Sequence, residues 1–406
     1  MKKQLLAASV LAALGLMQAQ AGTMDDGNLT IGGFGTLGVA KTNTDQVRFT
    51  RYNQAEGVSD QARIGLDSNL GLQATYKIND WLSGTAQVLT RKTTTTTFNT
   101  DLTWGFLKMK VNDEINVRVG RVVAPTFLIS DYQNVGYANT MMRPPVEMYG
   151  QNVLENMDGV DVNYQHSIGD FNLTAQGALG VSRGKLFVAS GGGSQATYRS
   201  PAYALAVAGE YGPFTLRMVH TLGKVDSNDI APLNSLTTTL KAVGFTQLAN
   251  DITLAGGKKI GFTAVGLVMD WRNILVQSEY AQRRAKEPVY VADTDAWYVM
   301  TGYRFGKILP YYSHASARGA GKSVTVPANF PKTGALAQAV NYGFLTSIEQ
   351  SSDLIGVRWD FAKAMALKVQ IDRVKPKVKG GFLGGGPAAG YTNNVTVVGA
   401  ALDFVF

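Results

Sequence analysis

The sequence lacks cysteine and contains only three histidines among its 406 residues. Without cysteine, disulfides and thiolate sites are excluded, so an exported form of the chain must gain its stability in another way. After the N-terminal segment, no stretch reaches the roughly 18 apolar residues that indicate a membrane-spanning helix. His166, His220 and His314 stand far apart without a carboxylate at ligand spacing, which argues against a metal site.

Strong charge clustering is also missing. The formal net charge is +8, but the basic residues are scattered along the whole chain. Proteins that bind nucleic acid usually gather lysine and arginine on one face or segment. We therefore predict no nucleic-acid partner, and no sequence motif indicates a cofactor.

The first residues have the pattern of a secretory signal peptide. Lys2 and Lys3 precede a short apolar run, and Ala19-Gln20-Ala21 supplies the small residues of a cleavage site. The run is shorter than the about 20 residues that span a bilayer, which favours a cleaved signal over a membrane anchor. We predict a signal peptide at residues 1–21, export from the cytoplasm, and one mature domain at residues 22–406.

Apolar and polar residues alternate with a period of two along most of the mature chain, which indicates β-strands. One example runs from Leu70 to Ile78, turns at Asn79-Asp80 and resumes at Leu82. The same pattern of strand, turn and strand recurs up to the C-terminus, and it predicts about sixteen strands. Short turns alternate with longer connections, the longest at about residues 41–62, 122–158, 222–260 and 316–351.

One segment does not fit the simple alternation. Between residues 101 and 111, Trp104 and Phe106 have one parity, whereas Leu107 and Met109 have the other. A β-bulge near Gly105 would reconcile the two halves of this strand.

An exported chain without cysteine and with this rhythm fits an all-β fold, a transmembrane antiparallel β-barrel. Every backbone polar group in lipid must be paired within the protein, so a sheet can cross only when it is closed. Alternation then separates a lipid face from a water face, with short periplasmic turns and long extracellular loops. Aromatic residues near the strand ends would form the interfacial girdles. These are Trp81, Tyr211, Trp271, Trp297, Phe305, Phe404 and Phe406.

The chain ends on an alternating strand, from Val395 to Phe406. Closure of a barrel requires this last strand to pair with the first, near Leu29 to Val39. The alternation that ends in Phe406 also resembles the C-terminal signal by which outer-membrane proteins are recognised for assembly. The resemblance implies the outer-membrane assembly machinery as a partner.

The mature chain resembles the sixteen-stranded porins of Gram-negative bacteria. The resemblance is carried by "NVRVGRVVAPTFLISDYQNVG" at residues 116–136, by "MMRPPVEMYG" at residues 141–150, and by the last strand. In such porins the fifth strand ends in a Gly-Arg pair, matched here by Gly120-Arg121, and a long third loop folds back into the barrel. The resemblance implies a constriction loop at residues 122–158, a homotrimer in the outer membrane, contact with membrane lipid and lipopolysaccharide, and passive diffusion of small hydrophilic solutes.

Charged residues inside a wide barrel would set its selectivity. Parity assigns several basic residues to the lumen, namely Lys77, Arg91, Arg118, Arg217, Arg304, Arg358 and Lys368. The third loop adds four charged residues, Asp131, Arg143, Glu147 and Glu155. We expect the loop acids to face wall arginines, with Arg118 and Arg121 the nearest in sequence, and a weak preference for anions.

Two motifs suggest other functions. "SARGAGKS" at residues 316–323 nearly matches a phosphate-binding loop, but Ser316 replaces its first glycine and no helical pattern follows. His314 and Ser316 have the His-x-Ser spacing of an outer-membrane phospholipase, without its supporting asparagine motif. A barrel enzyme and a channel specific for one solute therefore stand as alternatives to a general porin, and we predict that the chain is not an enzyme.

Overall fold

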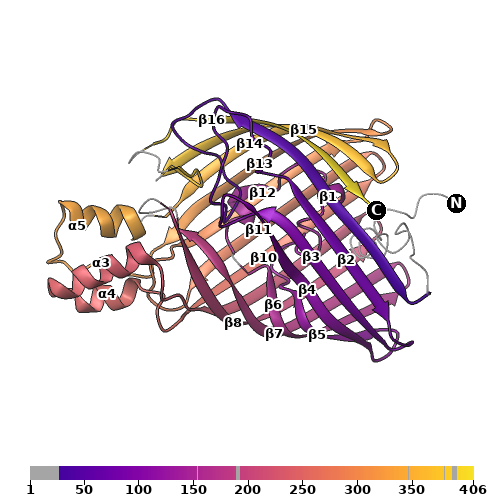
Figure 1. The fold of residues 1–406 in the computed structure, drawn as a ribbon, viewed down its shortest axis with the longest axis horizontal. Coiled ribbons are helices and arrows are strands. Elements are labelled where there is room, and N and C mark those ends of the chain that lie inside the picture. Colours follow the sequence, from indigo (N-terminus) through magenta and orange to yellow (C-terminus); the bar gives the residue numbers. More distant parts are fainter. Residues whose placement is uncertain (1–26, 153, 189–192, 346, 379, 386–390) are drawn as a thin grey trace.

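Sixteen antiparallel strands close into one barrel (Figure 1). The computed structural model describes residues 27–406 except 153, 189–192, 346, 379 and 386–390, so the predicted signal peptide at residues 1–21 lies outside the described residues. The strands are β1 (Leu29–Thr42), β2 (Asn69–Lys77), β3 (Leu82–Lys92), β4 (Phe98–Lys110), β5 (Ile115–Val123), β6 (Asn156–Ile168), β7 (Phe171–Val188), β8 (Ser194–Tyr211), β9 (Phe214–Val225), β10 (Lys258–Trp271), β11 (Ile274–Ala285), β12 (Asp293–Tyr303), β13 (Ile308–Gly321), β14 (Glu349–Ala362), β15 (Met365–Val378) and β16 (Val395–Val405). The predicted fold class is confirmed.

The alternation separates the two faces of the wall as predicted. On β2 and β3, Leu72 lies opposite Val88 and both side chains are exposed on the outer face. One position along, Gln73 lies opposite Gln87, and the two amides share a hydrogen bond of 2.9 Å inside the barrel. A charge on the outer face would lose its hydration in lipid, whereas amides can face the aqueous lumen.

The barrel closes where β16 pairs with β1. Gly33 and Phe406 exchange two backbone hydrogen bonds, of 2.8 and 2.9 Å. On the outer face the ring of Phe406 covers Gly33 and the ring of Phe404 covers Gly35, so that a Cβ at either glycine would collide with the ring. The aromatic rings therefore fill the space that the glycines leave, and the C-terminal residue is part of the wall.

The parity change in β4 has a cause close to the predicted one. The register between β3 and β4 shifts at Thr103, because Gln87 pairs with Trp104 while Val88 pairs with Leu102. Thr103 is the extra residue, and its hydroxyl donates to the backbone oxygen of Gln87 at 3.2 Å. The bulge thus lies two residues before Gly105, and it turns the Trp104 side chain inward, where it is 8% exposed.

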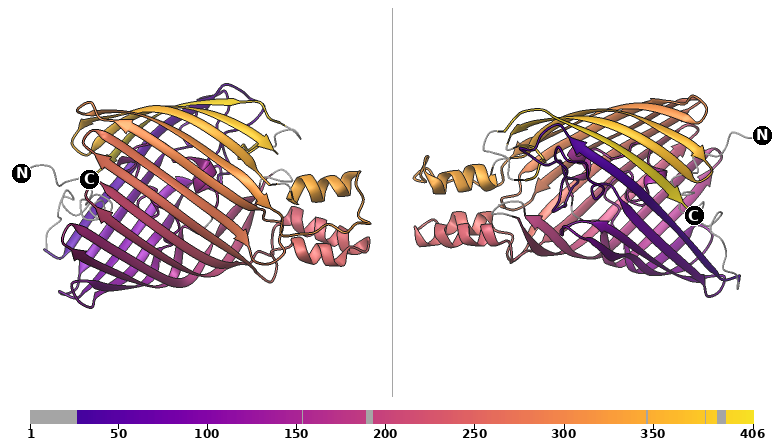
Figure 2. Two further views of the ribbon diagram at one scale, coloured as in Figure 1. Left: turned by 180° about the vertical axis from the view of Figure 1, so that it is seen from behind. Right: turned by 45° about the horizontal axis from the view of Figure 1, so that its top comes forward.

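The connections differ in length between the two ends of the barrel. Short turns gather at one end, and Gly212 and Gly306 take positive φ angles of 56° and 60° there. The long connections cover residues 43–68, 124–155, 226–257 and 322–348 at the other end (Figure 2). They lie close to the predicted loops, except that the first extends further along the chain.

The sequence patterns did not predict the helices in these connections. They are η1 (Gly136–Ala138), α2 (Val146–Tyr149), α3 (Ala231–Ala242), α4 (Thr246–Ile252), α5 (Ala335–Gln338) and the π-helix η3 (Ala339–Leu345). The helices α3, α4 and α5 project from the long-loop end (Figure 1), where Leu240, Leu248 and Val340 lie in a shared apolar cluster. Among the described residues, no helix is long and apolar enough to cross a membrane.

The wall is incomplete at one place near the long-loop end. β4 pairs with β5 only up to Gly105, and β7 pairs with β6 only up to Val181. Beyond these positions, residues 98–104 of β4 have ladder partners only in β3, and residues 182–188 of β7 have them only in β8. Asn53, from the connection 43–68, bonds the backbone of Lys185 at 2.9 Å and of Phe187 at 2.7 Å, which satisfies part of this open edge.

Candidate functional site

The connection 124–155, here called the inner loop, lies inside the barrel. Near its start, the Leu128 N–H donates to Glu279 on β11 at 2.9 Å. Further along, the Met142 N–H donates to Gln370 on β15 at 3.1 Å. At its end Ala124 and Glu155 lie side by side, since the N–H of the first donates to the carbonyl oxygen of the second at 3.0 Å. The inner loop therefore leaves the wall, contacts other strands within the lumen, and returns to its starting point.

Apolar side chains anchor the inner loop to the strands β10 to β13. Phe127 packs edge-on against Phe262 of β10, with 5.1 Å between ring centroids. Met141 and Met148 are buried in the same cluster, together with Tyr298 of β12. Apolar side chains inside a water-filled barrel gain free energy by packing together, so this cluster holds the loop against one part of the wall.

Arg143 is the main charged anchor of the inner loop. Its Nε donates to both carboxylate oxygens of Asp67 at 2.9 Å, and a terminal nitrogen donates to Asp372 of β15 at 2.5 Å. All three side chains are almost completely buried. Burial opposes the charge of Arg143, but the two carboxylates outweigh it and raise the pKa of the guanidinium. The predicted constriction residue Arg143 is thus engaged in holding the loop.

Two wall cations also hold the inner loop, through its backbone. Lys368 donates to the carbonyl oxygens of Gly136 at 2.7 Å and Asn139 at 2.6 Å, and it forms an ion pair with Asp403 at 2.8 Å. Arg358 donates to the carbonyl oxygens of Tyr137 at 2.8 Å and Asn139 at 3.0 Å. Parity placed Lys368 and Arg358 in the lumen, and the structure gives them partners on the loop there.

Glu147 lies on α2 and is also buried, at 1% exposure. Its carboxylate accepts a hydrogen bond from Gln350 of β14 at 2.7 Å. Burial raises the pKa of Glu147, and the hydrogen bonds oppose this only in part. The side chain faces the wall and contacts neither of the cavities described next.

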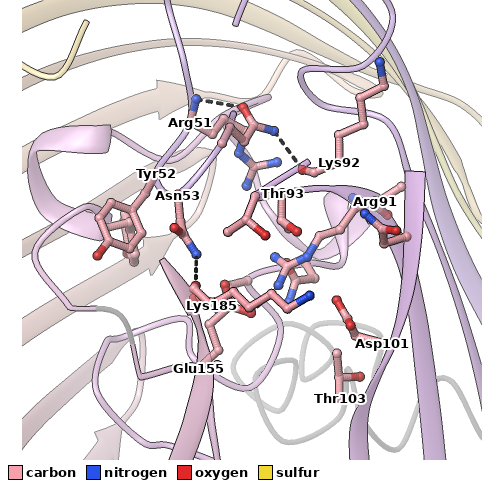
Figure 3. A pocket seen from close by; sticks show the side chains of 18 of the residues that line it. Arg51, Tyr52, Asn53, Arg91, Lys92, Thr93, Asp101, Thr103, Glu155 and Lys185 are labelled. Atoms are coloured by element: carbon pink, nitrogen blue, oxygen red, sulfur yellow. Dashed lines mark hydrogen bonds and ion pairs between the residues drawn. The ribbon is translucent and has the colours of Figure 1, made fainter. Parts of the chain in front are cut away.

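An open cavity of about 510 Å³ remains beside the inner loop. Its walls are the strands β3, β4, β7 and β8, the connection 43–68 and parts of the inner loop. Figure 3 shows Arg51 and Tyr52 at one side of this cavity and Arg91, Asp101 and Thr103 at the other. The cavity follows the wall that the inner loop leaves uncovered.

A second cavity, of about 40 Å³, adjoins the first. The two cavities share five of their lining residues, which are Thr103, Gln133, Asn134, Glu155 and Asn156. At this junction Arg91 donates to Asn134 at 3.0 Å and forms an ion pair with Glu155. At this junction between β3, β4 and the inner loop, polar and oppositely charged groups therefore face each other.

The charges around the large cavity are nearly balanced, with a small positive excess. Its basic lining residues are Arg51, Arg91, Lys92, Arg121, Arg143, Arg183 and Lys185, and its acidic ones are Asp67, Asp101 and Glu155. Three further acids, Glu56, Asp158 and Asp372, form ion pairs with lining cations. Seven cations against six acids leave a net charge of +1.

The structure brings only some of the predicted constriction residues to the junction of the two cavities. Glu155 and Asp131 line the second cavity, and Asp131 lies 3.4 Å from Arg217 of β9. Arg118 instead pairs with Asp161 of β6, at 2.9 Å from Nε. Two predicted lumen residues lie at the short-turn end, where Lys77 pairs with Asp80 and Arg304 pairs with Asp270.

Arg121 takes a different position from the one expected of a residue facing the loop acids. Val119 is exposed on the outer face and Val122 is fully buried, so alternation carries Arg121 to the outer side of the wall. It pairs there with Asp158 at 2.7 Å, and Asp158 also contacts Arg183 of β7. Arg121 reaches the large cavity only because the wall is open between β4 and β7.

Sequence reasoning missed Arg51, Asn53 and Lys185. Arg51 and Asn53 belong to the connection 43–68, in which no alternation indicates a direction for the side chain. Lys185 has the outward parity of β7 and lines the cavity at the open wall. For the connection 43–68, the sequence offered one indication of a role in the cavity, namely the positively charged residues within the predicted loop 41–62.

The motifs with other possible functions have structural roles in the wall. Residues 316–321 of "SARGAGKS" continue the strand β13 and do not form a loop before a helix. His314 lies on the outer face and contacts Asp353 of β14 at 2.7 Å, while no hydrogen bond joins it to Ser316 among the described residues. The described residues also contain no group of three or more metal-binding side chains.

Comparisons with known proteins find similarity in structure but not in sequence. No family model matches the chain, and no curated protein matches it. An anion-selective porin from Comamonas acidovorans is 14% identical, with a TM-score of 0.53 over 93% of this chain and 99% of the porin. OmpF of Salmonella typhi is 16% identical, with a TM-score of 0.52 over 95% of this chain and 99% of OmpF. The outer-membrane protein OmpT of Vibrio cholerae is 12% identical, with a TM-score of 0.52 over 94% of this chain and 99% of OmpT. This chain therefore has the sixteen-stranded barrel fold of Gram-negative porins.

Proposed function

We propose that this protein is an outer-membrane porin, a water-filled channel for the passive diffusion of small hydrophilic solutes and ions. One observation carries the proposal: the inner loop crosses a closed sixteen-stranded barrel and leaves a polar cavity along the uncovered wall. A barrel of this size is too wide for its own side chains to fill, so water occupies the remaining space. The channel is not an enzyme.

The junction near Arg91 sets the size limit in this proposal. Arg91, Asn134 and Glu155 surround it with donors and acceptors that can replace part of the hydration shell of a passing solute. Apolar solutes would gain nothing from these groups. The inner loop is held by Arg143, Lys368 and the apolar cluster, so the size of the opening is fixed during passage.

A weak preference for anions follows from Arg51 and Lys185. Neither side chain forms an ion pair with an acid among the described residues. Desolvation, together with the charges of Arg91 and Arg143, lowers the pKa of Arg51, yet an arginine in a protein remains charged at neutral pH. A passing anion would relieve this unfavourable environment, and a cation would make it worse.

The cellular setting belongs to the same proposal. The signal peptide at residues 1–21 would direct export, and residues 22–406 would form the barrel domain in the outer membrane, with residues 122–158 as the constriction loop. Phe406 would serve as the assembly signal, and the assembled protein would be a homotrimer surrounded by lipid and lipopolysaccharide.

A channel specific for one organic anion is the second candidate. Arg51 and Lys185, which line one cavity and form no ion pair among the described residues, favour it, because an anion with two charged groups could contact both. A specific channel would show saturable block by its solute, whereas a general porin conducts in proportion to salt concentration.

Single-channel recording in planar bilayers tests the proposal. In a potassium chloride gradient, the reversal potential of the wild type should show a small preference for chloride. The double substitution R51Q/K185Q should shift it toward potassium, because it changes the net charge around the cavity by two. The matched control K241Q/K332Q removes the same charge from the exposed connections 226–257 and 322–348, and it should not shift the reversal potential. Absence of conductance in the wild-type protein would contradict the proposal that it is a porin. Equal shifts of the reversal potential in both double variants would contradict the role of Arg51 and Lys185 in the anion preference.

A further inference from the structure

Three lysines form a row on the outer face of the barrel, near its long-loop end. Lys224 of β9 lies directly opposite Lys259 of β10. The N–H of Lys286, just after β11, donates to the carbonyl oxygen of Lys259 at 2.8 Å, which places the third lysine beside the second. All three side chains are exposed. We call these residues the lysine row.

The outward direction of the row follows from the residues below it on the same strands. Leu222 and Met218 precede Lys224 at outward positions of β9, and Met218 is 55% exposed. Thr263 and Leu267 have the same parity as Lys259 on β10 and are exposed as well. The row therefore continues the lipid-facing surface of the wall and does not enter the lumen.

Like charges lie side by side in this row. Side chains directly opposite on neighbouring antiparallel strands have Cβ atoms about 5 Å apart, where equal charges repel. Among the described residues, no acid forms an ion pair with Lys224, Lys259 or Lys286. By contrast, the outward arginine one step closer to the apolar band, Arg284, pairs with Asp295.

The level of the row corresponds to a particular layer of the membrane. Tyr280 of β11 and Trp297 of β12 lie opposite each other on the outer face and mark an aromatic girdle. Lys286 stands three outward positions beyond Tyr280, toward the long loops. Charged side chains just beyond an aromatic girdle meet the headgroups of the lipid leaflet, because the hydrocarbon ends at the girdle.

We propose that the lysine row binds the phosphate groups of lipopolysaccharide in the outer leaflet. A phosphate offers several charged acceptor oxygens, and two or three lysines can share it as point charges. The bound phosphate removes the repulsion within the row, while the acyl chains of the same lipid cover Leu222 and Met218. This inference rests on the proposed outer-membrane location, and it is independent of the ion preference of the channel, since the row lies outside the lumen.

The test compares purified full-length protein with the variant K224Q/K259Q/K286Q in detergent micelles. Thermal unfolding is recorded with added bisphosphorylated lipid A, with lipid A from which the phosphates were removed, and with inorganic phosphate. The wild type should be stabilised by bisphosphorylated lipid A only, and the variant should bind it about 100-fold more weakly, since each lysine near a charged membrane surface contributes about 1 kcal/mol.

A control separates the row from general charge effects. The variant K241Q/K307Q/K332Q removes three exposed lysines elsewhere and should bind bisphosphorylated lipid A like the wild type. Without lipid, K224Q/K259Q/K286Q should be at least as stable as the wild type, because the repulsion is gone, which excludes misfolding as the cause of weak binding. Equal affinity of the two triple variants, or equal stabilisation by inorganic phosphate or dephosphorylated lipid A, would overturn the proposal.

Discussion

Replacement of Arg143 by methionine should release the inner loop from the wall. The substitution keeps an unbranched side chain but removes the charge that Asp67 and Asp372 share. Removing one member of a buried ion pair typically costs about 3–5 kcal/mol, because the remaining charge stays buried without a partner. Here two carboxylates lose the same cation, so the cost should lie in this range or above it.

Two measurements would detect the expected loss of stability and the release of the inner loop in R143M. Unfolding in urea should show a reduced free energy of unfolding, and single-channel recordings should show larger current fluctuations as the loop moves in the lumen. Additional substitution of the acids, in R143M/D67N/D372N, should restore much of the stability, because no unpaired charge then remains.

A matched control uses an ion pair near the surface. Arg63 pairs with Glu56 and its side chain is 44% exposed, so R63M should cost no more than about 1 kcal/mol. The reasoning is refuted if R143M is as stable and as quiet as the wild type, or if the triple variant is no more stable than R143M.

Three further predictions concern the C-terminus, a buried acid and the inner loop. Deletion of Phe406 removes two backbone hydrogen bonds to Gly33, each worth about 1 kcal/mol, and should reduce the amount of folded, heat-modifiable protein in outer-membrane fractions; normal amounts would argue against the assembly role. Burial raises the pKa of Glu147, so wild-type stability should fall as the pH rises above about 4.3, the value in unfolded chains, and become level above the raised value. Urea midpoints of E147Q should lack this decrease, and equal pH profiles would contradict the assignment. Replacement of residues 126–152 by a short glycine-serine linker should raise single-channel conductance, since the ends of the loop are already adjacent; unchanged conductance would place the constriction elsewhere.

The wall could be predicted from the sequence because lipid imposes a strict rule on it. Each strand has a lipid face and a water face, so the parity of residues such as Leu72 and Gln73 reports their direction. The irregular strand β4 was found for the same reason, and only the position of its bulge differed. The sixteen strands, the closure at Phe406 and the long connections therefore followed from periodicity.

The inner arrangement could not be predicted in the same way. Arg143 meets Asp67 and Asp372 across long sequence separations, and no local pattern encodes such a contact. Several expected lumen cations are engaged with wall acids or with the loop backbone, as Arg118 and Lys368 show.

The sequence of the long connections contains a helical pattern, which the analysis of strand alternation did not detect. In residues 226–257, Leu233, Leu236 and Leu240 follow one another at helical spacing, and all three are buried in the apolar cluster beside the barrel. A search for the helical period within the predicted loop 222–260 would have found α3.

The contacts of Lys368 and Arg358 with the inner loop have an evolutionary consequence. Both cations bind carbonyl oxygens of residues 136–141, which every amino acid supplies. Side chains at positions such as 138 and 140 can therefore change without loss of these two attachments, whereas the ring of Tyr137 also lies against Arg358 and the amide of Asn139 donates to Tyr132 and Val135. Gly136 is a further exception, because a Cβ there would collide with Asp403 and Thr36. Sequence variation at positions such as 138 and 140 would therefore leave the attachment of the loop to the wall unchanged.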